Sequence, residues 1–116
     1  MNNLKNKVSL IGRLGAAPEY TKFENGSQLA KFSLATNDNY KDKNGQWHER
    51  TDWHLINVWG KLAERMNNDL NKGSEVLIEG KIAYQNYETK TGEKKFITVI
   101  EAIDYLMIKE KPAKVN

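Results

Sequence analysis

The stretch of residues 50–61 constrains the fold most, because it alternates with the period of a β-strand, whose side chains point to opposite faces in turn. One face would carry Trp53, Leu55, Asn57 and Trp59, and the other His54, Ile56 and Val58. The face with His54, Ile56 and Val58 is predicted to point into the core. The other face has two indoles beside polar groups. About 20 Å of strand separates these indoles at ~3.3 Å per residue, which suits flat rings that stack at separate points. The alternative is a sheet covered on both sides, with both tryptophans in the core.

Length and composition limit the class of protein. The 116 residues suffice for one domain with a hydrophobic core. No apolar run reaches membrane-spanning length, and the N-terminal residues lack a signal-peptide core, so we expect a cytoplasmic protein without membrane contact. The absence of cysteine excludes disulfides, thiol catalysis and cysteine metal sites. A formal net charge of +3 permits a polyanionic partner, although many enzymes share it.

The remaining chain is predicted to consist of short strands and one helix. Beside 50–61, we expect strands over 7–15, 20–23, 29–36, 75–84 and 96–108, the last bent or bulged within 101–104. Ile82 is expected to face inward. The helix is predicted over 61–72, with Leu62, Met66 and Leu70 in one apolar stripe and Gly73 as its C-terminal cap.

Polar segments with turn residues connect these elements. Residues 37–49 and 85–95 are expected to be polar loops or hairpin tips, turning at Asn44-Gly45 and Thr91-Gly92. The order predicts an all-β domain over residues 1–108, namely an OB-fold: a five-stranded Greek-key barrel with one helix between strands 3 and 4. A simple sandwich would leave the helix unexplained. Residues 109–116 are expected to form a short basic disordered tail.

Catalytic chemistry is missing from the sequence. His48 and His54 have no nucleophile that the sequence pairs with them, and His54 falls on the apolar face, where a structural hydrogen bond is the usual role. There is no phosphate loop. The Gly12–Gly15 segment matches the GXXG clamp of KH domains but lacks the flanking helices. We therefore expect no enzymatic activity, no metal and no cofactor.

Aromatic side chains are interleaved with basic ones on loops, hairpin tips and the outward strand face. These aromatics are Tyr40, Trp47, Trp53, Trp59, Tyr84 and Tyr87. Bases stack on flat apolar rings for ~1–3 kcal/mol each, and phosphates need cations along the track. The pattern therefore predicts binding of single-stranded nucleic acid without reading of its sequence. For Trp47 and Tyr84 the alternative is packing against the barrel or the base of a loop.

Nearly the whole of residues 6–108 resembles the bacterial and mitochondrial single-stranded-DNA-binding protein family. The matching segments are Asn6-Lys7-Val8, Gly12-Arg13-Leu14-Gly15 with Pro18-Glu19, Leu34-Ala35-Thr36, Thr51-Asp52-Trp53-His54, Gly60-Lys61-Leu62-Ala63-Glu64, and Lys72-Gly73-Ser74 with Ile78-Glu79-Gly80. The resemblance implies an OB-fold homotetramer that binds and protects single-stranded DNA in replication, recombination and repair. It also implies that His54 lies at a subunit contact.

The family's four stacking positions fall on Tyr40, Trp53, Trp59 and Tyr87 of this sequence. With nearby basic residues, the expected DNA-binding set is Tyr40, Trp53, Trp59, Tyr87, Lys7, Arg13, Lys31, Lys41, Lys43, Lys61 and Lys81. The alternative function is a primosome-type OB-fold interaction protein with weaker DNA contact, which the four stacking positions disfavour. Stacking and charge alone do not distinguish DNA from RNA.

The C-terminal end departs from the family pattern. Cellular members end in a flexible linker and an acidic tip that recruits partner enzymes, whereas this chain ends with residues 111–116, Lys-Pro-Ala-Lys-Val-Asn. Either the chain is a tail-less plasmid, phage or organellar relative, or it is a piece of a longer protein. The resemblance therefore leaves the recruitment of replication and repair enzymes open for this sequence.

Overall fold

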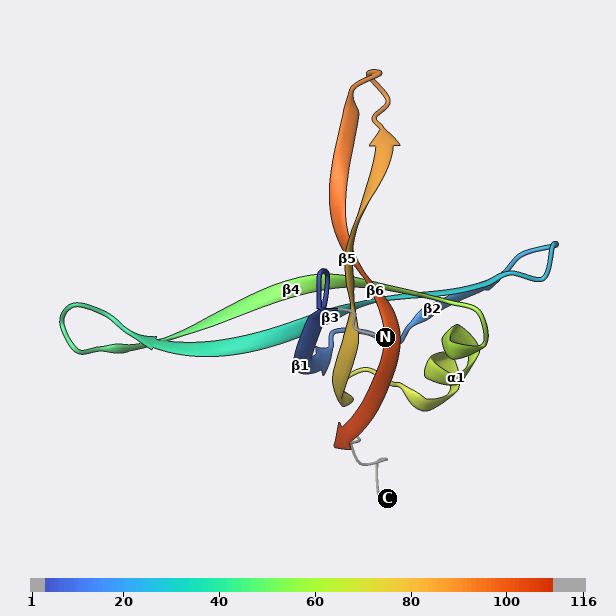
Figure 1. Ribbon diagram of the computed structural model, residues 1–116. Coiled ribbons are helices and arrows are strands. Elements are labelled where there is room, and N and C mark those ends of the chain that lie inside the picture. The colour runs from blue at the N-terminus through green and yellow to red at the C-terminus, as the bar shows by residue number, and fades with distance from the viewer. Residues whose placement is uncertain (1–3, 110–116) are drawn as a thin grey trace.

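The structure, a computed structural model, describes residues 4–109 (Figure 1). Its elements are β1 (Val8–Leu14), β2 (Glu19–Lys22), β3 (Gln28–Lys41), β4 (Trp47–Trp59), α1 (Lys61–Asp69), β5 (Glu75–Glu88) and β6 (Lys94–Lys109). Each predicted strand and the single helix are present. Four strands are longer than predicted, because the polar segments between β3 and β4 and between β5 and β6 are paired hairpins.

The strands close into a barrel. They follow the order β1-β5-β6-β4-β3-β2, and an additional pairing of β1 with β3 closes a ring of five, which leaves β2 at the side of β3. All pairs are antiparallel except β4 with β6. Gly12 permits the closure, since a Cβ there would lie 2.2 Å from the backbone oxygen of Ala35. The helix lies between the third and fourth barrel strands, so the predicted OB-fold is confirmed.

The core lies inside the barrel and under α1. The fully buried large side chains include Leu34, Ile56, Val58, Met66, Leu70, Val76 and Ile78. The helix is tied to β6 by the Tyr105 hydroxyl, which donates to Asp69 Oδ2 over 2.6 Å, and by the Arg65 guanidinium above the Tyr105 ring. Burial, and then the Asp69 carboxylate, raise the pKa of the Tyr105 phenol. The predicted apolar stripe of the helix faces the barrel, because Met66 and Leu70 are buried in the core and Leu62 packs against it.

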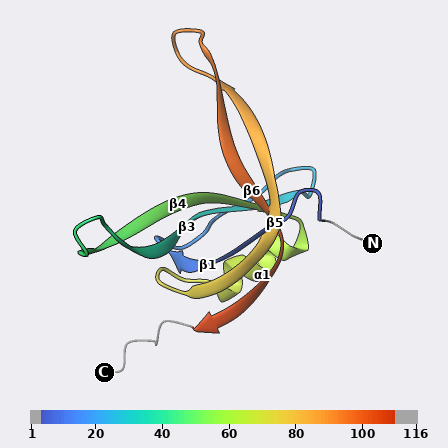
Figure 2. The same cartoon turned by 60° about the vertical axis from the view of Figure 1, so that its left-hand side comes forward.

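Three hairpins project from the barrel in different directions (Figures 1 and 2). The β3–β4 hairpin stays paired out to Lys41 opposite Trp47, and the β5–β6 hairpin out to Glu88 opposite Lys94. Gly45 and Gly92 lie at their tips with φ of 80° and 86°, a region that favours glycine. The third and shortest hairpin joins β2 to β3 and turns at Gly26.

Two local predictions are wrong, and one is confirmed. Ile82 is 39% exposed instead of inward, because β5 and β6 leave the barrel there. The helix ends at Asp69 with Leu70 as its cap, so Gly73 belongs to the turn before β5, where its N–H donates to the Leu14 carbonyl. The predicted bulge in β6 is present, opposite Glu79 and Gly80.

The limits of the described chain bear on two further expectations. Of the predicted tail, only Lys109 falls within the described residues, as the last residue of β6, and residues 110–116 lie outside them. Among residues 4–109, no helix is both long and apolar enough to cross a membrane.

Candidate nucleic-acid interface

The outward face of β4 presents the two predicted tryptophans to solvent. Trp53 is 60% exposed and Trp59 47%, whereas Ile56 and Val58 on the other face are fully buried. The alternative that both tryptophans belong to the core is therefore wrong. His54 lies half-buried on the core side, where its Nε2 is 3.0 Å from the Thr36 hydroxyl, a structural contact of the predicted kind.

Trp53 occupies space that Gly15 leaves open. A Cβ on Gly15 would lie 2.6 Å from Cζ3 and 2.9 Å from Cη2 of the indole, closer than carbon atoms approach one another. Gly15 follows β1 and donates its N–H to the Ser33 carbonyl, which fixes this backbone against β3. The indole is thus seated on backbone at one edge and remains largely exposed.

Trp59 belongs to a second aromatic group at the end of β4. The ring of Phe23, from the β2–β3 turn, lies 6.3 Å from the Trp59 ring at an interplanar angle of 24°. Gly60, with φ of 78°, turns the chain into α1, whose first residue is Lys61. Sequence reasoning missed Phe23, because only the pairing of β2 with β3 and of Leu29 with Trp59 brings the two rings together.

The β3–β4 hairpin carries a third aromatic group near its tip. Tyr40 is 49% exposed and stacks on His48, with ring centroids 5.3 Å apart. His48 Nε2 lies 2.7 Å from Asp42 Oδ2, and Asp42 also accepts from the backbone N–H groups of Asn44 and Gln46. The His48 contact and these backbone bonds lower the pKa of the Asp42 carboxyl. The Tyr40 ring is therefore positioned by its cross-strand partner His48, and the Asp42 carboxylate in the hairpin tip positions His48.

Two basic residues and Trp47 complete this hairpin. Lys41 pairs with Trp47, which is 69% exposed, and Lys43 lies in the turn. The exposure of Trp47 excludes its packing against the barrel, the alternative considered from the sequence.

The β5–β6 hairpin presents aromatics on both of its faces. Tyr87 is 49% exposed and shares a strand face with Gln85, which lines a groove beside Trp53. Tyr84 and Phe96 lie on the opposite face, 70% and 73% exposed. Sequence reasoning missed Phe96, because Phe96 falls on the same strand face as the core residue Ile100. The sequence does not show that the strand has left the barrel at Phe96.

The predicted cations fall into two groups. Lys7, Arg13 and Lys81 each form an ion pair on the β1–β5 side, with Glu79, Glu75 and Glu101. Lys31, Lys41, Lys43 and Lys61 form no ion pair within residues 4–109 and lie along β3, its hairpin and the start of α1. Lys31, Lys41 and Lys43 therefore lie on β3 or in its hairpin and Lys61 follows β4, and Arg13 is the ion-paired cation that lies opposite β3, at Ala35.

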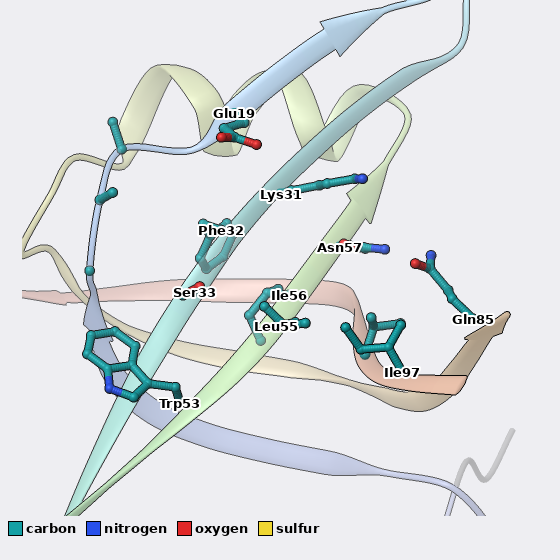
Figure 3. A pocket seen from close by; sticks show the side chains of 14 residues that line it. Glu19, Lys31, Phe32, Ser33, Trp53, Leu55, Ile56, Asn57, Gln85 and Ile97 are labelled. Atoms are coloured by element: carbon teal, nitrogen blue, oxygen red, sulfur yellow. The ribbon is translucent and has the colours of Figure 1, made fainter. Parts of the chain in front are cut away.

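A groove of about 520 Å³ opens beside Trp53, between the segment after β1 and the β5–β6 hairpin (Figure 3). Trp53 lies at one end and Leu55 next to it, while Lys31, Asn57 and Gln85 lie toward the other end, where Ile97 is the cross-strand partner of Gln85. No group of three or more metal-ligating side chains occurs among the described residues. The site is therefore an open surface of rings, cations and one groove.

Comparisons with known proteins agree with this arrangement. The model of the Single-strand binding protein family matches residues 5–108. The chain is 43% identical to "Single-stranded DNA-binding protein 1" of Chlorobaculum tepidum over 91% of its length and 66% of that relative's, and 38% identical to the protein of that name from Xylella fastidiosa over 91% and 79%. It spans half the length of a Neisseria meningitidis relative at 47% identity.

Solved structures give the same result. The fold is similar to that in "Plasmodium falciparum SSB complex with ssDNA", with a TM-score of 0.82 and 31% identity over 90% of this chain and 95% of that one. A Thermus aquaticus single-stranded DNA binding protein has a TM-score of 0.79 and 31% identity over 90% of this chain and 50% of that one. With its barrel, its exposed rings and a family match over nearly all the described residues, this chain belongs to the Single-strand binding protein family.

Proposed function

We propose that this protein binds and protects single-stranded DNA without enzymatic activity and without reading its sequence, in replication, recombination and repair. The observation that carries the proposal is the set of exposed rings Tyr40, Trp53, Trp59 and Tyr87 on one barrel and its hairpins. The likeness to a solved protein in complex with single-stranded DNA supports it. A cytoplasmic location is part of the same proposal.

Each part of the surface has a role in this function. The rings offer flat faces on which unpaired bases stack, and every base has such a face, so binding tolerates any sequence. Lys31, Lys41, Lys43 and Lys61 neutralise phosphates between the rings, which releases counterions and favours binding. Lys7, Arg13 and Lys81 extend the track, since exposed ion pairs of this kind contribute little and can exchange for phosphate. A paired duplex hides its base faces, so we expect it to bind weakly.

A tryptophan variant tests the stacking role. Bound oligothymidine should quench much of the intrinsic tryptophan fluorescence, and Trp53→Ala should weaken binding by ~1–3 kcal/mol per stacked base. Because Trp53 is 60% exposed, the variant should melt close to the parent temperature. A core tryptophan would instead cost about 3–5 kcal/mol of stability. A variant that unfolds easily but binds the strand normally per folded molecule would disprove the stacking role.

We further propose a homotetramer. Ile11, Leu77 and Leu106 stand opposite one another on β1, β5 and β6, and Ile11 and Leu106 are 56% and 62% exposed on the outside of the barrel. Within the described residues, Val8–Gly12 pair with β5 alone, so the other edge of β1 is open to another strand. A second copy would cover both features. Sedimentation that shows only monomer at micromolar concentration would contradict the proposed homotetramer. The same result would contradict the predicted role of His54 at a subunit contact.

The second candidate function is the primosome-type interaction protein. The exposure of rings at all four family stacking positions favours the single-strand binder. A helicase partner with micromolar or weaker DNA affinity would favour the alternative. Recruitment of repair or replication enzymes is not part of the proposed function.

A further inference from the structure

Asn57 is a buried polar side chain on a strand face that also carries two exposed rings. It lies on the outward face of β4 with the exposed Trp53 and Trp59, yet it is only 4% exposed. Its Nδ2 is buried and has no hydrogen-bond partner within residues 4–109. An unpaired buried donor costs ~1–3 kcal/mol, so native structures rarely retain one without a reason.

Asn57 lines the groove beside Trp53, at the end where other polar groups gather. Lys31 is its direct cross-strand partner on β3, and Gln85 approaches from the β5–β6 hairpin (Figure 3). Lys31 has no ion pair within residues 4–109, even though Glu19 stands opposite it on β2. On the other side of Asn57, Glu101 is engaged by Lys81 at 3.7 Å. One ammonium, two amides and the carboxylate of Glu19 therefore line this end of the groove, and the carboxylate forms no ion pair with Lys31.

The chemistry of these groups selects an anion with several acceptor oxygens. An ammonium group is donor-only, and each carboxamide offers two N–H donors that can point at the anion while its carbonyl oxygen, an acceptor, points away. The other end of the groove is formed by Trp53, a ring suited to a base. Asn57 lies four residue steps along β4 from Trp53, about 13 Å, so an anion at one end and a base at the other would belong to nearby nucleotides of one strand.

We propose that Lys31, Asn57 and Gln85 form a phosphate-binding subsite for the backbone of the strand whose base stacks on Trp53. The inference rests on the proposed single-strand function and deepens it. Asn57 and Gln85 are additions to the expected DNA-binding residues, and they act as neutral donors. Asn57 Nδ2 is itself covered in this structure, so the Asn57 side chain must turn toward the groove for a phosphate oxygen to accept from it, and that bond would satisfy the donor that residues 4–109 leave unpaired.

Two variants and a control test the subsite by titration with oligothymidine and with an abasic oligomer of the same length. Asn57→Leu should weaken both by roughly tenfold, since hydrogen bonds to charged groups contribute ~1.5–3 kcal/mol. The thermal midpoint should not fall, because an apolar group of similar shape removes the unpaired donor. Gln85→Leu, at an exposed position that cannot unfold the core, should weaken both several-fold. Asn86→Leu, the same change on the opposite face of the hairpin, should not.

Salt dependence separates the neutral donors from the cation. Lys31→Met should lower the slope of log affinity against log salt by ~0.7, one single-strand phosphate, while Asn57→Leu should leave the slope unchanged. Normal binding by Asn57→Leu and Gln85→Leu would overturn the subsite and leave the proposed function intact. A loss seen only with oligothymidine would also overturn it, because the contact would then be to a base. A parent protein that binds no single strand would instead remove the proposed function, and the subsite with it.

Discussion

Gly15→Ala should weaken single-strand binding without removing any group that is proposed to contact the strand. The added Cβ would lie 2.6 Å from Cζ3 of Trp53. Carbon atoms in contact are ~3.5–4.0 Å apart, so the indole must withdraw by about 1 Å. Trp53 is 60% exposed and free to move toward solvent, whereas the backbone of Gly15 is fixed to β3 through Ser33.

The size of the effect follows from the stacking energy. A stacked base contributes ~1–3 kcal/mol, and a ring displaced by about 1 Å keeps part of that contact, so we expect a loss of about 1 kcal/mol, roughly fivefold. Stability should move the other way. Gly15 does not have a positive φ, so alanine fits its backbone and restricts the unfolded chain, a gain of ~0.4–1 kcal/mol.

Fluorescence titration with oligothymidine and thermal unfolding measure the two quantities. The matched control is Gly15→Ala in a Trp53→Ala background, where the methyl group meets no ring and affinity should match Trp53→Ala alone. The reasoning is refuted if Gly15→Ala binds like the parent, or if it loses the same factor in both backgrounds.

Two further predictions concern the β3–β4 hairpin and the assembly. The pKa of Asp42 is lowered in the folded hairpin, so its contacts stabilise the tip fully at pH values above the pKa of Asp42 in the unfolded chain. This stabilisation is lost as the pH falls through the pKa of Asp42 in the folded protein. The amide resonances of Asn44 and Gln46 should report this acid transition, and Asp42→Asn should abolish it. Ile11→Lys should shift the sedimentation profile toward smaller species while the fold persists, since Ile11 is 56% exposed; an unchanged profile would contradict the proposed contact at Leu77 and Leu106.

The parts of the fold that sequence predicts are those where burial imposes a period. Ile56 and Val58 alternate with Trp53 and Trp59 because one face of β4 is core and the other is not. The stripe of Leu62, Met66 and Leu70 likewise identified the helix. In the hairpins, both faces are solvated, so no apolar period marks the pairing of Lys41 with Trp47 or the point at which Ile82 leaves the core.

The residues of the candidate site could be predicted where neighbouring residue types in the sequence already indicate their role. Exposed rings beside lysines could be recognised in the sequence, since their unusual context is local. Contacts between distant segments could not: Gly15 beneath Trp53, Phe23 beside Trp59, and Gln85 near Asn57 each depend on barrel closure or hairpin direction. The burial of Asn57 could not be predicted either, because its neighbours on the outward face of β4, Leu55 and Trp59, are exposed. Asn57 is covered only where β4 lies between β3 and β6.

The central claim is that unpaired bases stack on the exposed rings while phosphates meet the lysines. The most direct test is one salt titration with single-stranded DNA and duplex DNA of equal length, side by side. We predict tight binding of the single strand, a log-linear fall of ~0.7 per neutralised phosphate, and much weaker duplex binding at every salt concentration. Equal affinity for the two forms would contradict the claim, because charge alone would then account for binding.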